Sequence, residues 1–197
     1  MTGPIGVLAL QGDFREHAAM VRSLGADPVE VRTPEELDAV SALIIPGGES
    51  TTIGRLARIY GLMGPLRERI EAGMPVLGTC AGMIFLAAAT TGPDQPQLGV
   101  LDVVVERNAF GRQVDSFESD LDIAGFDTPM RAVFIRAPWI HKVGGNVEVL
   151  TNVVDPETGE PRPVVVRQGR ILATSFHPEL TDDTRVHEML LAMAEES

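Results

Sequence analysis

The sequence has little of several residue types, and each shortage excludes a class of protein. One cysteine in 197 residues rules out a disulfide within the chain and suits a reducing compartment. No apolar run approaches the ~20 residues that span a bilayer, and residues 1–4 lack the basic and long apolar stretches of a signal peptide. We therefore expect a cytoplasmic protein that does not bind membranes.

Positive charge is also scarce. Lys142 is the only lysine, Lys and Arg total 16 against 28 Asp and Glu, and the formal net charge is −12. Binding to nucleic acid requires clustered cations that neutralise phosphates. The composition therefore argues against a nucleic-acid partner.

Apolar residues make up 44% of the chain, which is ample for a core, and the length suits a single domain over residues 1–197. In the first half, short apolar runs alternate with amphipathic helical patterns. The predicted strands are 5–10, 28–31, 42–45 and 75–78, and the predicted helices are 14–24, a short one from 34, 51–60 and 65–72. This alternation is typical of a doubly wound parallel sheet.

Three of these helices begin with capping signals. Asp13 precedes the first, with Glu16 three residues later, and Thr33 precedes the second, with Glu36 three residues later. Ser50 is the expected cap of the third helix.

The second half of the chain is richer in strand patterns. The predicted strands are 100–106, 116–123, 131–135, 147–153, 164–167 and 170–175, with a closing helix at 183–194. Gln168 and Gly169 indicate a hairpin between the last two strands. We expect a three-layer α/β/α fold with a mostly parallel central sheet and an antiparallel extension.

Cys80 lies between Gly78 and Gly82, where a predicted strand meets an alanine-rich helix expected to reach Ala89. Glycines on both sides allow the sharp turn of a nucleophile elbow, which projects the central side chain. The helix N-terminus favours a thiolate there, and the N–H of Ala81 is placed to receive an oxyanion. A lone cysteine is also compatible with a buried structural role; the two glycines favour the nucleophile.

The chain has four histidines from which to draw a base for this thiol. His17 and His187 fall on polar positions of predicted amphipathic helices, where we expect them to be solvated. His141 lies in an irregular stretch, and its role stays open. His177 follows a predicted strand, at the sheet edge where open α/β folds build their sites.

Glu179 stands two residues after His177, with Pro178 between them. In an extended segment, positions i and i+2 point the same way, so the carboxylate is able to orient the imidazole. His-x-Glu alone is equally compatible with a surface turn. Its combination with the cysteine elbow favours a Cys-His-Glu triad.

A glycine pair, Gly47 and Gly48, follows the predicted strand 42–45 and precedes a helix. Adjacent glycines let backbone N–H groups approach a ligand closely. A phosphate cradle is disfavoured because the segment lacks both the GxGxxG spacing and a Walker lysine. An oxyanion hole shared with Ala81 fits better, and Glu49 offers an acceptor for a substrate ammonium group.

Taken together, the segments 46–51, 78–82 and 177–179 resemble class I (triad) glutamine amidotransferases. Residues 6–17 and 107–118 are similar to a narrower family, the glutaminase subunits of pyridoxal 5′-phosphate synthase. The resemblance spans nearly the whole chain and implies a flavodoxin-like α/β/α fold.

The resemblance implies a role for each matching residue. Cys80 is the expected nucleophile, His177 the base and Glu179 its orienting group. The expected glutamine site comprises Gly47, Gly48, Glu49, Arg107, Ile135 and Arg136, the Ile135–Arg136 pair acting largely through main chain, with Gln11 as a weaker candidate. From the residues alone, the two arginines are better explained as surface residues.

The implied reaction is hydrolysis of L-glutamine to L-glutamate and ammonia. In this family, ammonia passes to a barrel-shaped synthase subunit that builds pyridoxal phosphate from a pentose phosphate and a triose phosphate. The resemblance implies no metal and no cofactor here, and no bound pyridoxal phosphate for this chain's own chemistry. The alternatives are a stand-alone Cys-His-Glu hydrolase such as an intracellular peptidase, a catalytically idle regulatory subunit, and an amidotransferase with another acceptor.

Overall fold

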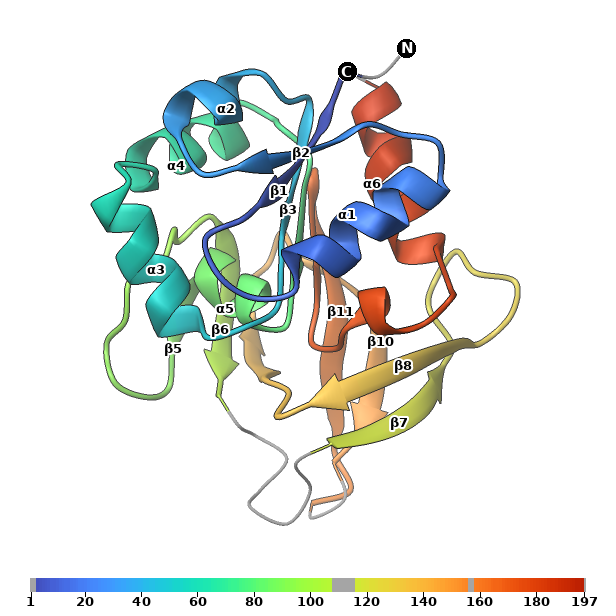
Figure 1. The fold of residues 1–197 in the computed structure, drawn as a ribbon. Helices are drawn as coiled ribbons and strands as arrows, with labels where there is room; N and C mark the ends of the chain where they lie inside the picture. Colours follow the sequence, from blue (N-terminus) through green and yellow to red (C-terminus); the bar gives the residue numbers. More distant parts are fainter. Residues whose placement is uncertain (1–2, 108–115, 156–157, 197) are drawn as a thin grey trace.

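A computed structural model describes residues 3–107, 116–155 and 158–196 (Figure 1). Its centre is a seven-stranded sheet with the order β10-β11-β12-β4-β3-β1-β2. The parallel strands are β1 (Ile5–Leu8), β2 (Pro28–Val31), β3 (Ala42–Ile45), β4 (Val76–Thr79) and β12 (Ile171–Thr174). The antiparallel strands are β10 (Glu148–Val154) and β11 (Pro161–Gln168). This confirms the expected mostly parallel sheet with an antiparallel extension.

Helices cover both faces of the sheet (Figure 1). One face carries α1 (Phe14–Ser23) and α6 (Arg185–Glu195); the other carries α2 (Pro34–Asp38), α3 (Ser50–Ile59), α4 (Met63–Glu71) and α5 (Ala81–Leu86). Side chains of β3 alternate accordingly. Leu43 and Ile45 join the core beneath α3, while Ala42 and Ile44 join the core beneath α1. The three-layer architecture is therefore confirmed.

Two small sheets flank these layers. One contains β5 (Ala87–Thr90), β6 (Leu101–Glu106) and β9 (Trp139–Val143); the other pairs β7 (Ser116–Leu121) with β8 (Met130–Ile135). A 3₁₀ turn, η1 (Pro178–Leu180), follows β12. Within the described residues, no helix has the length and apolar character needed to cross a membrane.

The alanine-rich helix predicted to reach Ala89 ends at Leu86, and β5 takes its place. The returning chain satisfies the end of the helix, because the N–H of Leu98 donates to the carbonyl of Phe85 at 2.7 Å. β5 then pairs in parallel with β6. Tertiary pairing outweighs the intrinsic helix preference of alanine here.

The three predicted caps have different outcomes. Thr33 and Glu36 form the expected reciprocal capping box at α2. The prediction that Ser50 caps α3 is wrong. The cap is the preceding residue, Glu49, whose carboxylate accepts the free N–H groups of Thr51 and Thr52. Asp13 makes no side-chain capping bond at α1. The carboxylates of Asp13 and Glu49 both lie at the edge of the sheet where the candidate site forms.

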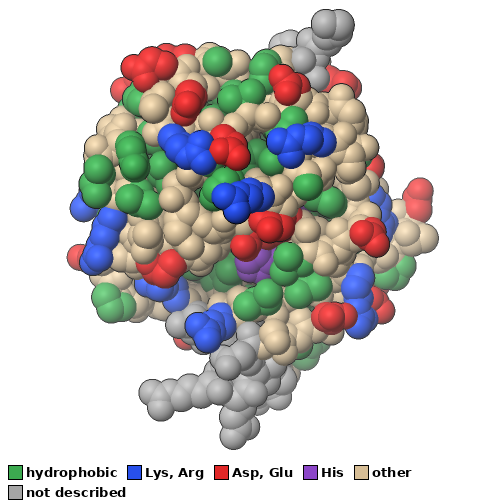
Figure 2. All heavy atoms as spheres, viewed as in Figure 1, with side chains coloured by type: hydrophobic (Ala, Val, Ile, Leu, Met, Phe, Trp, Pro, Cys, Tyr) green, Lys and Arg blue, Asp and Glu red, His purple; other side chains and the backbone are tan. Residues whose placement is uncertain are grey.

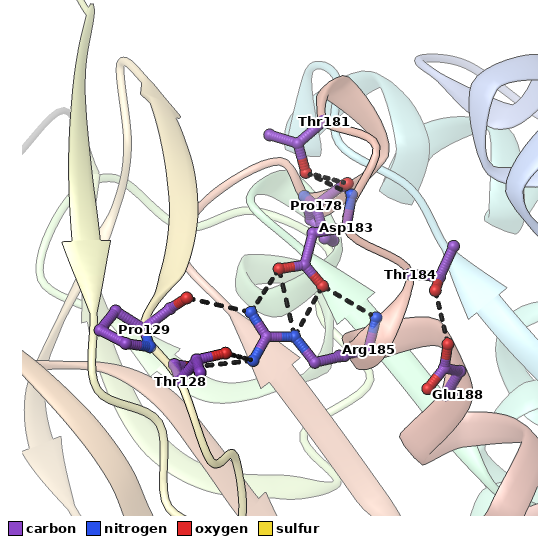
Figure 3. Close-up of polar contacts among 8 residues, drawn as sticks. All are labelled: Thr128, Pro129, Pro178, Thr181, Asp183, Thr184, Arg185 and Glu188. Carbon is purple, nitrogen blue, oxygen red and sulfur yellow. Dashed lines mark hydrogen bonds and ion pairs between the residues drawn. The ribbon is translucent and has the colours of Figure 1, made fainter.

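Arg185 at the start of α6 ties this helix to the chain before β8 (Figure 3). Its guanidinium donates to both carboxylate oxygens of Asp183 and to the carbonyls of Thr128 and Pro129. Since charge-assisted bonds are stronger than neutral ones, we expect Arg185→Ala to lower the free energy of unfolding by about 2 kcal/mol. Urea denaturation of the purified chain measures this change.

Arg131 is the matched control for that substitution. It also pairs with two carboxylates, Glu118 and Asp120, but its side chain is 53% exposed. Exposed ion pairs add little stability, so Arg131→Ala should have a much smaller effect than Arg185→Ala. Equal losses in the two variants would contradict a special role of Arg185.

Candidate active site

The carboxyl ends of the parallel strands meet at one edge of the sheet, where a cavity of about 620 Å³ opens. β4 leads into Cys80 and β12 leads to His177. These strands are parallel neighbours, with Thr79 in register with Thr174. The cavity is lined by Asp13, Gly48, Glu49, Ser50, Cys80, Ala81, Ile84, Arg107, Ser116, Ile135, Arg136 and His177.

Cys80 has the backbone of a nucleophile elbow. Its φ of 48° and ψ of −104° are rarely adopted by a residue with a side chain. The N–H of Cys80 donates to the carbonyl of Thr174 at 2.8 Å, which fixes the turn to β12. Cys80 is 7% exposed, and its Sγ lies 4.0 Å from the carbonyl oxygen of Ile135.

The two flanking glycines serve packing rather than the turn itself. Neither Gly78 nor Gly82 has a positive φ. A Cβ on Gly82 would lie 2.0 Å from the carbonyl oxygen of Ile45, and one on Gly78 would lie 2.5 Å from Leu86. The glycines therefore let α5 lie directly against β3 and β4, while Cys80 alone adopts the unusual backbone conformation.

His177 and Glu179 form the second part of the site. Nδ1 of His177 donates to Oε1 of Glu179 at 2.7 Å, and both residues are buried. The segment differs from the extended one predicted, because Pro178–Leu180 forms the 3₁₀ turn η1. The contact forms nonetheless, since the turn brings the carboxylate within hydrogen-bond distance of Nδ1.

Asp13 is a site residue that the sequence pattern presents only as a helix cap. Its Oδ2 lies 3.4 Å from Nδ1 of His177, so two carboxylates face the same ring nitrogen. Burial acts to lower the pKa of His177, but hydrogen bonds with Asp13, Cys80 and Glu179 outweigh it and raise the pKa to about 12. The imidazole is therefore held protonated beside the thiol.

Gly47 of the glycine pair lies against His177. A Cβ on Gly47 would lie 2.3 Å from Cε1 of His177, so only glycine fits there. Gly48 has a φ of 149° and lines the cavity together with Ala81. The side-chain oxygen of Gln11 accepts the N–H of Glu49 at 2.6 Å and joins the loop after β1 to the loop after β3.

Glu49 and Arg107 form a charged pair in the cavity wall. Nη2 of Arg107 lies 3.3 Å from Oε1 of Glu49, and Nη1 donates to Gln95 at 3.2 Å. Burial acts to raise the pKa of Glu49, but hydrogen bonds from Thr52 and Thr51 outweigh it and lower the pKa to about 2. The carboxylate is therefore ionised at neutral pH.

Ile135 and Arg136 close the cavity beside the thiol. Arg136 has a φ of 44°, the other non-glycine residue with a positive φ among the described residues. Residues 108–115, most of the distinctive segment 107–118, lie outside the described part of the chain.

On the face in Figure 2, Lys and Arg side chains are interspersed with Asp and Glu rather than gathered in a basic patch.

The remaining histidines differ from expectation. His17 and His187, predicted to be solvated, are 0% and 1% exposed. The helix pattern fails because η1 packs against α1, and His17 of α1 contacts His187 of α6 on the face that a single amphipathic helix would present to water. His141 lies in strand β9 rather than an irregular stretch, and its side chain is exposed.

The chain was compared with known proteins. Residues 7–196 match the model of the SNO glutamine amidotransferase family. The chain is 55% identical over 195 residues to the pyridoxal 5′-phosphate synthase subunit PdxT of Mycobacteroides abscessus, covering 98% of each chain. It is 58% identical over 192 residues to that of Acidothermus cellulolyticus, covering 96% of this chain and 92% of the relative.

Solved structures give the same result. A crystal structure of a glutamine amidotransferase is 54% identical, with a TM-score of 0.91, and the match covers 98% of this chain and 100% of that one. A putative GMP synthase subunit from Thermoplasma acidophilum, at 16% identity and a TM-score of 0.71, shares the fold. The site geometry and these matches lead to one conclusion: the chain belongs to the SNO glutamine amidotransferase family.

Proposed function

We propose that this chain hydrolyses L-glutamine as the glutaminase subunit of a pyridoxal 5′-phosphate synthase and passes the ammonia to a synthase subunit. The observation that carries the proposal is the arrangement of Cys80, His177 and Glu179 at a cavity. The PdxT relatives, similar over nearly their whole length, support the choice of pathway. A single reactive thiol needs reducing surroundings, so we place the protein in the cytoplasm.

The reaction follows from the positions of the three residues. The thiolate of Cys80 attacks the side-chain carbonyl carbon of glutamine, and main-chain N–H groups of Ala81 and Gly48 stabilise the oxyanion. His177 then gives its proton to the departing nitrogen, which leaves as ammonia and yields a thioester. Water attacks the thioester carbonyl as His177 takes its proton, and glutamate leaves. Glu179 keeps the imidazole oriented and stabilises its cation.

We assign recognition of the ammonium and carboxylate groups of glutamine to Glu49 and Arg107, the charged pair in the cavity wall. Glu49 is ionised and able to accept from the substrate ammonium, while Arg107 is able to bind the carboxylate. Ile135 and Arg136 border the thiol and offer main-chain groups to the substrate. Gly47 contributes space for His177 rather than a direct contact.

The test is glutamate production by the purified chain, alone and with its synthase subunit, with Cys80→Ala alongside. Ammonia released by an undocked subunit would be lost to water, so we expect low activity alone and a clear rise with the synthase. Equal rates in both conditions would remove this synthase as the partner. Turnover of peptides by the chain alone would favour a stand-alone hydrolase, and inactivity in both conditions would favour an idle regulatory subunit.

A further inference from the structure

A second polar cluster joins the triad through Glu179, with side chains from α1, α6, β4 and η1; Figure 1 shows these elements. Nδ1 of His17 lies 2.9 Å from Nε2 of His187. The other ring nitrogen of His17, Nε2, lies 3.1 Å from Oγ1 of Thr79 and 3.3 Å from Oε2 of Glu179. All four side chains are buried. The reaction described above gives neither imidazole a task.

Both imidazoles of the cluster are neutral near pH 7. Burial, with the neighbouring His187 and His177, holds the pKa of His17 well below 6.5. Burial also lowers the pKa of His187 to about 4. A neutral imidazole carries one N–H donor and one lone-pair acceptor, so the position of each proton decides which way the hydrogen bonds run.

The partners of the ring nitrogens fix those positions. Nδ1 of His187 is buried without a hydrogen-bond partner among the described residues. Buried N–H groups without a partner are rarer than acceptors without one, so we assign the proton of His187 to Nε2, from which it donates to Nδ1 of His17. Nδ1 of His17 is then an acceptor, which leaves the proton of His17 on Nε2.

That N–H has two acceptors within reach, because Nε2 of His17 lies 3.1 Å from Oγ1 of Thr79, with which it makes the aligned hydrogen bond, and 3.3 Å from the second oxygen of the triad carboxylate. Oε1 of Glu179 is taken by His177, whereas Oε2 is buried and makes no well-aligned hydrogen bond with a described residue. Nε2 of His17, 3.3 Å away, is placed to supply one. Hydrogen bonds of a resting catalytic site are often long or misaligned and shorten in the substrate complex.

We propose that His17 is a positioning residue that donates its Nε2–H to Oε2 of Glu179 and keeps this carboxylate ionised, and that His187 holds the tautomer in which His17 donates. The proposal rests on the proposed function, since it needs Glu179 to stabilise the cation of His177. Burial raises the pKa of Glu179 and so favours its neutral form. A donor on Oε2 opposes that tendency.

The other titratable groups around Glu179 limit the size of the effect. His177 donates to it directly, and Asp13 supplies a second negative charge 3.4 Å from Nδ1 of His177. Asp13 therefore supports the imidazolium in part when Glu179 is weakened. We expect loss of His17 to slow the reactions of Cys80 strongly without abolishing them.

The first test uses the only cysteine of the chain as its reporter. The rate of Cys80 alkylation by iodoacetamide is measured from pH 5 to 9 in the full chain. We expect His17→Leu to lower the rate near pH 6.5 about tenfold and to move the midpoint about one pH unit upward. His17→Gln, whose amide is able to donate to Oε2, should restore most of the alkylation rate and reverse most of the shift in the pH midpoint. His141→Leu, an exposed histidine changed in the same way, is the control.

The results separate this proposal from the proposed function. A wild-type thiol that alkylates like free cysteine would count against the triad itself. A reactive wild-type thiol with His17→Leu unchanged, or with His17→Gln and His17→Leu equally impaired, would overturn the role of His17 alone. In a Glu179→Gln background, His17→Leu should lower the alkylation rate of Cys80 little further, because both changes act on one carboxylate.

A measurement on the unmodified chain covers the case in which His17→Leu does not fold. With ¹⁵N-labelled histidine, the nitrogen shifts at pH 7 report each tautomer. We expect His17 and His187 both neutral and protonated on Nε2. A proton on Nδ1 of His17 would overturn the proposal, because Nε2 would then have no hydrogen to donate to Glu179.

Discussion

Replacing Cys80 with alanine is expected to abolish glutamine hydrolysis, lowering the rate at least about a thousandfold in the presence of the synthase subunit. Loss of the only thiol removes the nucleophile, and no second cysteine is available to replace it. The measurement is glutamate release at saturating glutamine. Residual turnover above the uncatalysed rate would contradict the assignment of Cys80 as nucleophile.

Comparison of Cys80→Ala with Cys80→Gly tests the elbow separately. Alanine keeps the Cβ and therefore the unfavourable φ of 48°, whereas glycine relieves it. Strain of about 1–3 kcal/mol exceeds the ~0.4–1 kcal/mol that glycine loses to unfolded-state entropy. We expect Cys80→Gly to be the more stable variant by about 1 kcal/mol, with both inactive.

Ala81→Gly in α5 is the control for that comparison. Ala81 begins α5 and has no positive φ, so glycine there relieves no strain and should destabilise the chain by up to about 1 kcal/mol, the opposite sign. Urea midpoints with unchanged m-values give both differences. If Cys80→Gly proved less stable than Cys80→Ala, the backbone at Cys80 would not be strained.

Replacing Gly82 with alanine is expected to cause the largest loss of stability, about 3 kcal/mol or more. The new Cβ would lie 2.0 Å from the carbonyl oxygen of Ile45, which is backbone at the carboxyl end of the inner strand β3 and cannot rotate away. α5 would have to move off β3, and Cys80 at its first turn would move with it. We therefore expect glutaminase activity to fall together with stability.

Gly64→Ala in α4 is the matched control. A Cβ there meets nothing within 4 Å, so alanine should leave stability unchanged or raise it by up to about 1 kcal/mol. Denaturation in urea compares the two variants directly. Similar stability of Gly82→Ala and Gly64→Ala would show that α5 does not need the close approach to β3.

The sequence alone was sufficient for the layered fold and for the positions of Cys80 and His177. Buried parallel strands are continuous apolar runs, and each functional residue directly follows such a run. Because parallel strands end at one edge, residues 97 positions apart in the sequence were expected to meet. The boundaries of α5 and β5 were less predictable, because the returning chain rather than alanine propensity ends that helix.

The partners of the proposed triad could not be predicted from local pattern. Asp13 has the signature of a helix cap, but its carboxylate faces His177, which lies in a distant segment of the chain. Similarly, Ser50 is a good cap by composition, but Glu49 reaches the free N–H groups first and also meets Arg107. Local sequence patterns indicate which residues are able to form a hydrogen bond or ion pair, and tertiary packing determines which of those contacts form.

What the sequence determined by itself is the chemistry available at the sheet edge: one thiol, one His-x-Glu and one glycine pair, each following a predicted strand. What only the tertiary structure decided is the environment of that chemistry. His17 and His187 occupy polar positions of separate helices, and each helix taken alone would turn them toward water. Packing of α1 against η1 and α6 buries them together behind Glu179. Periodicity describes one helix at a time, whereas burial depends on what covers it.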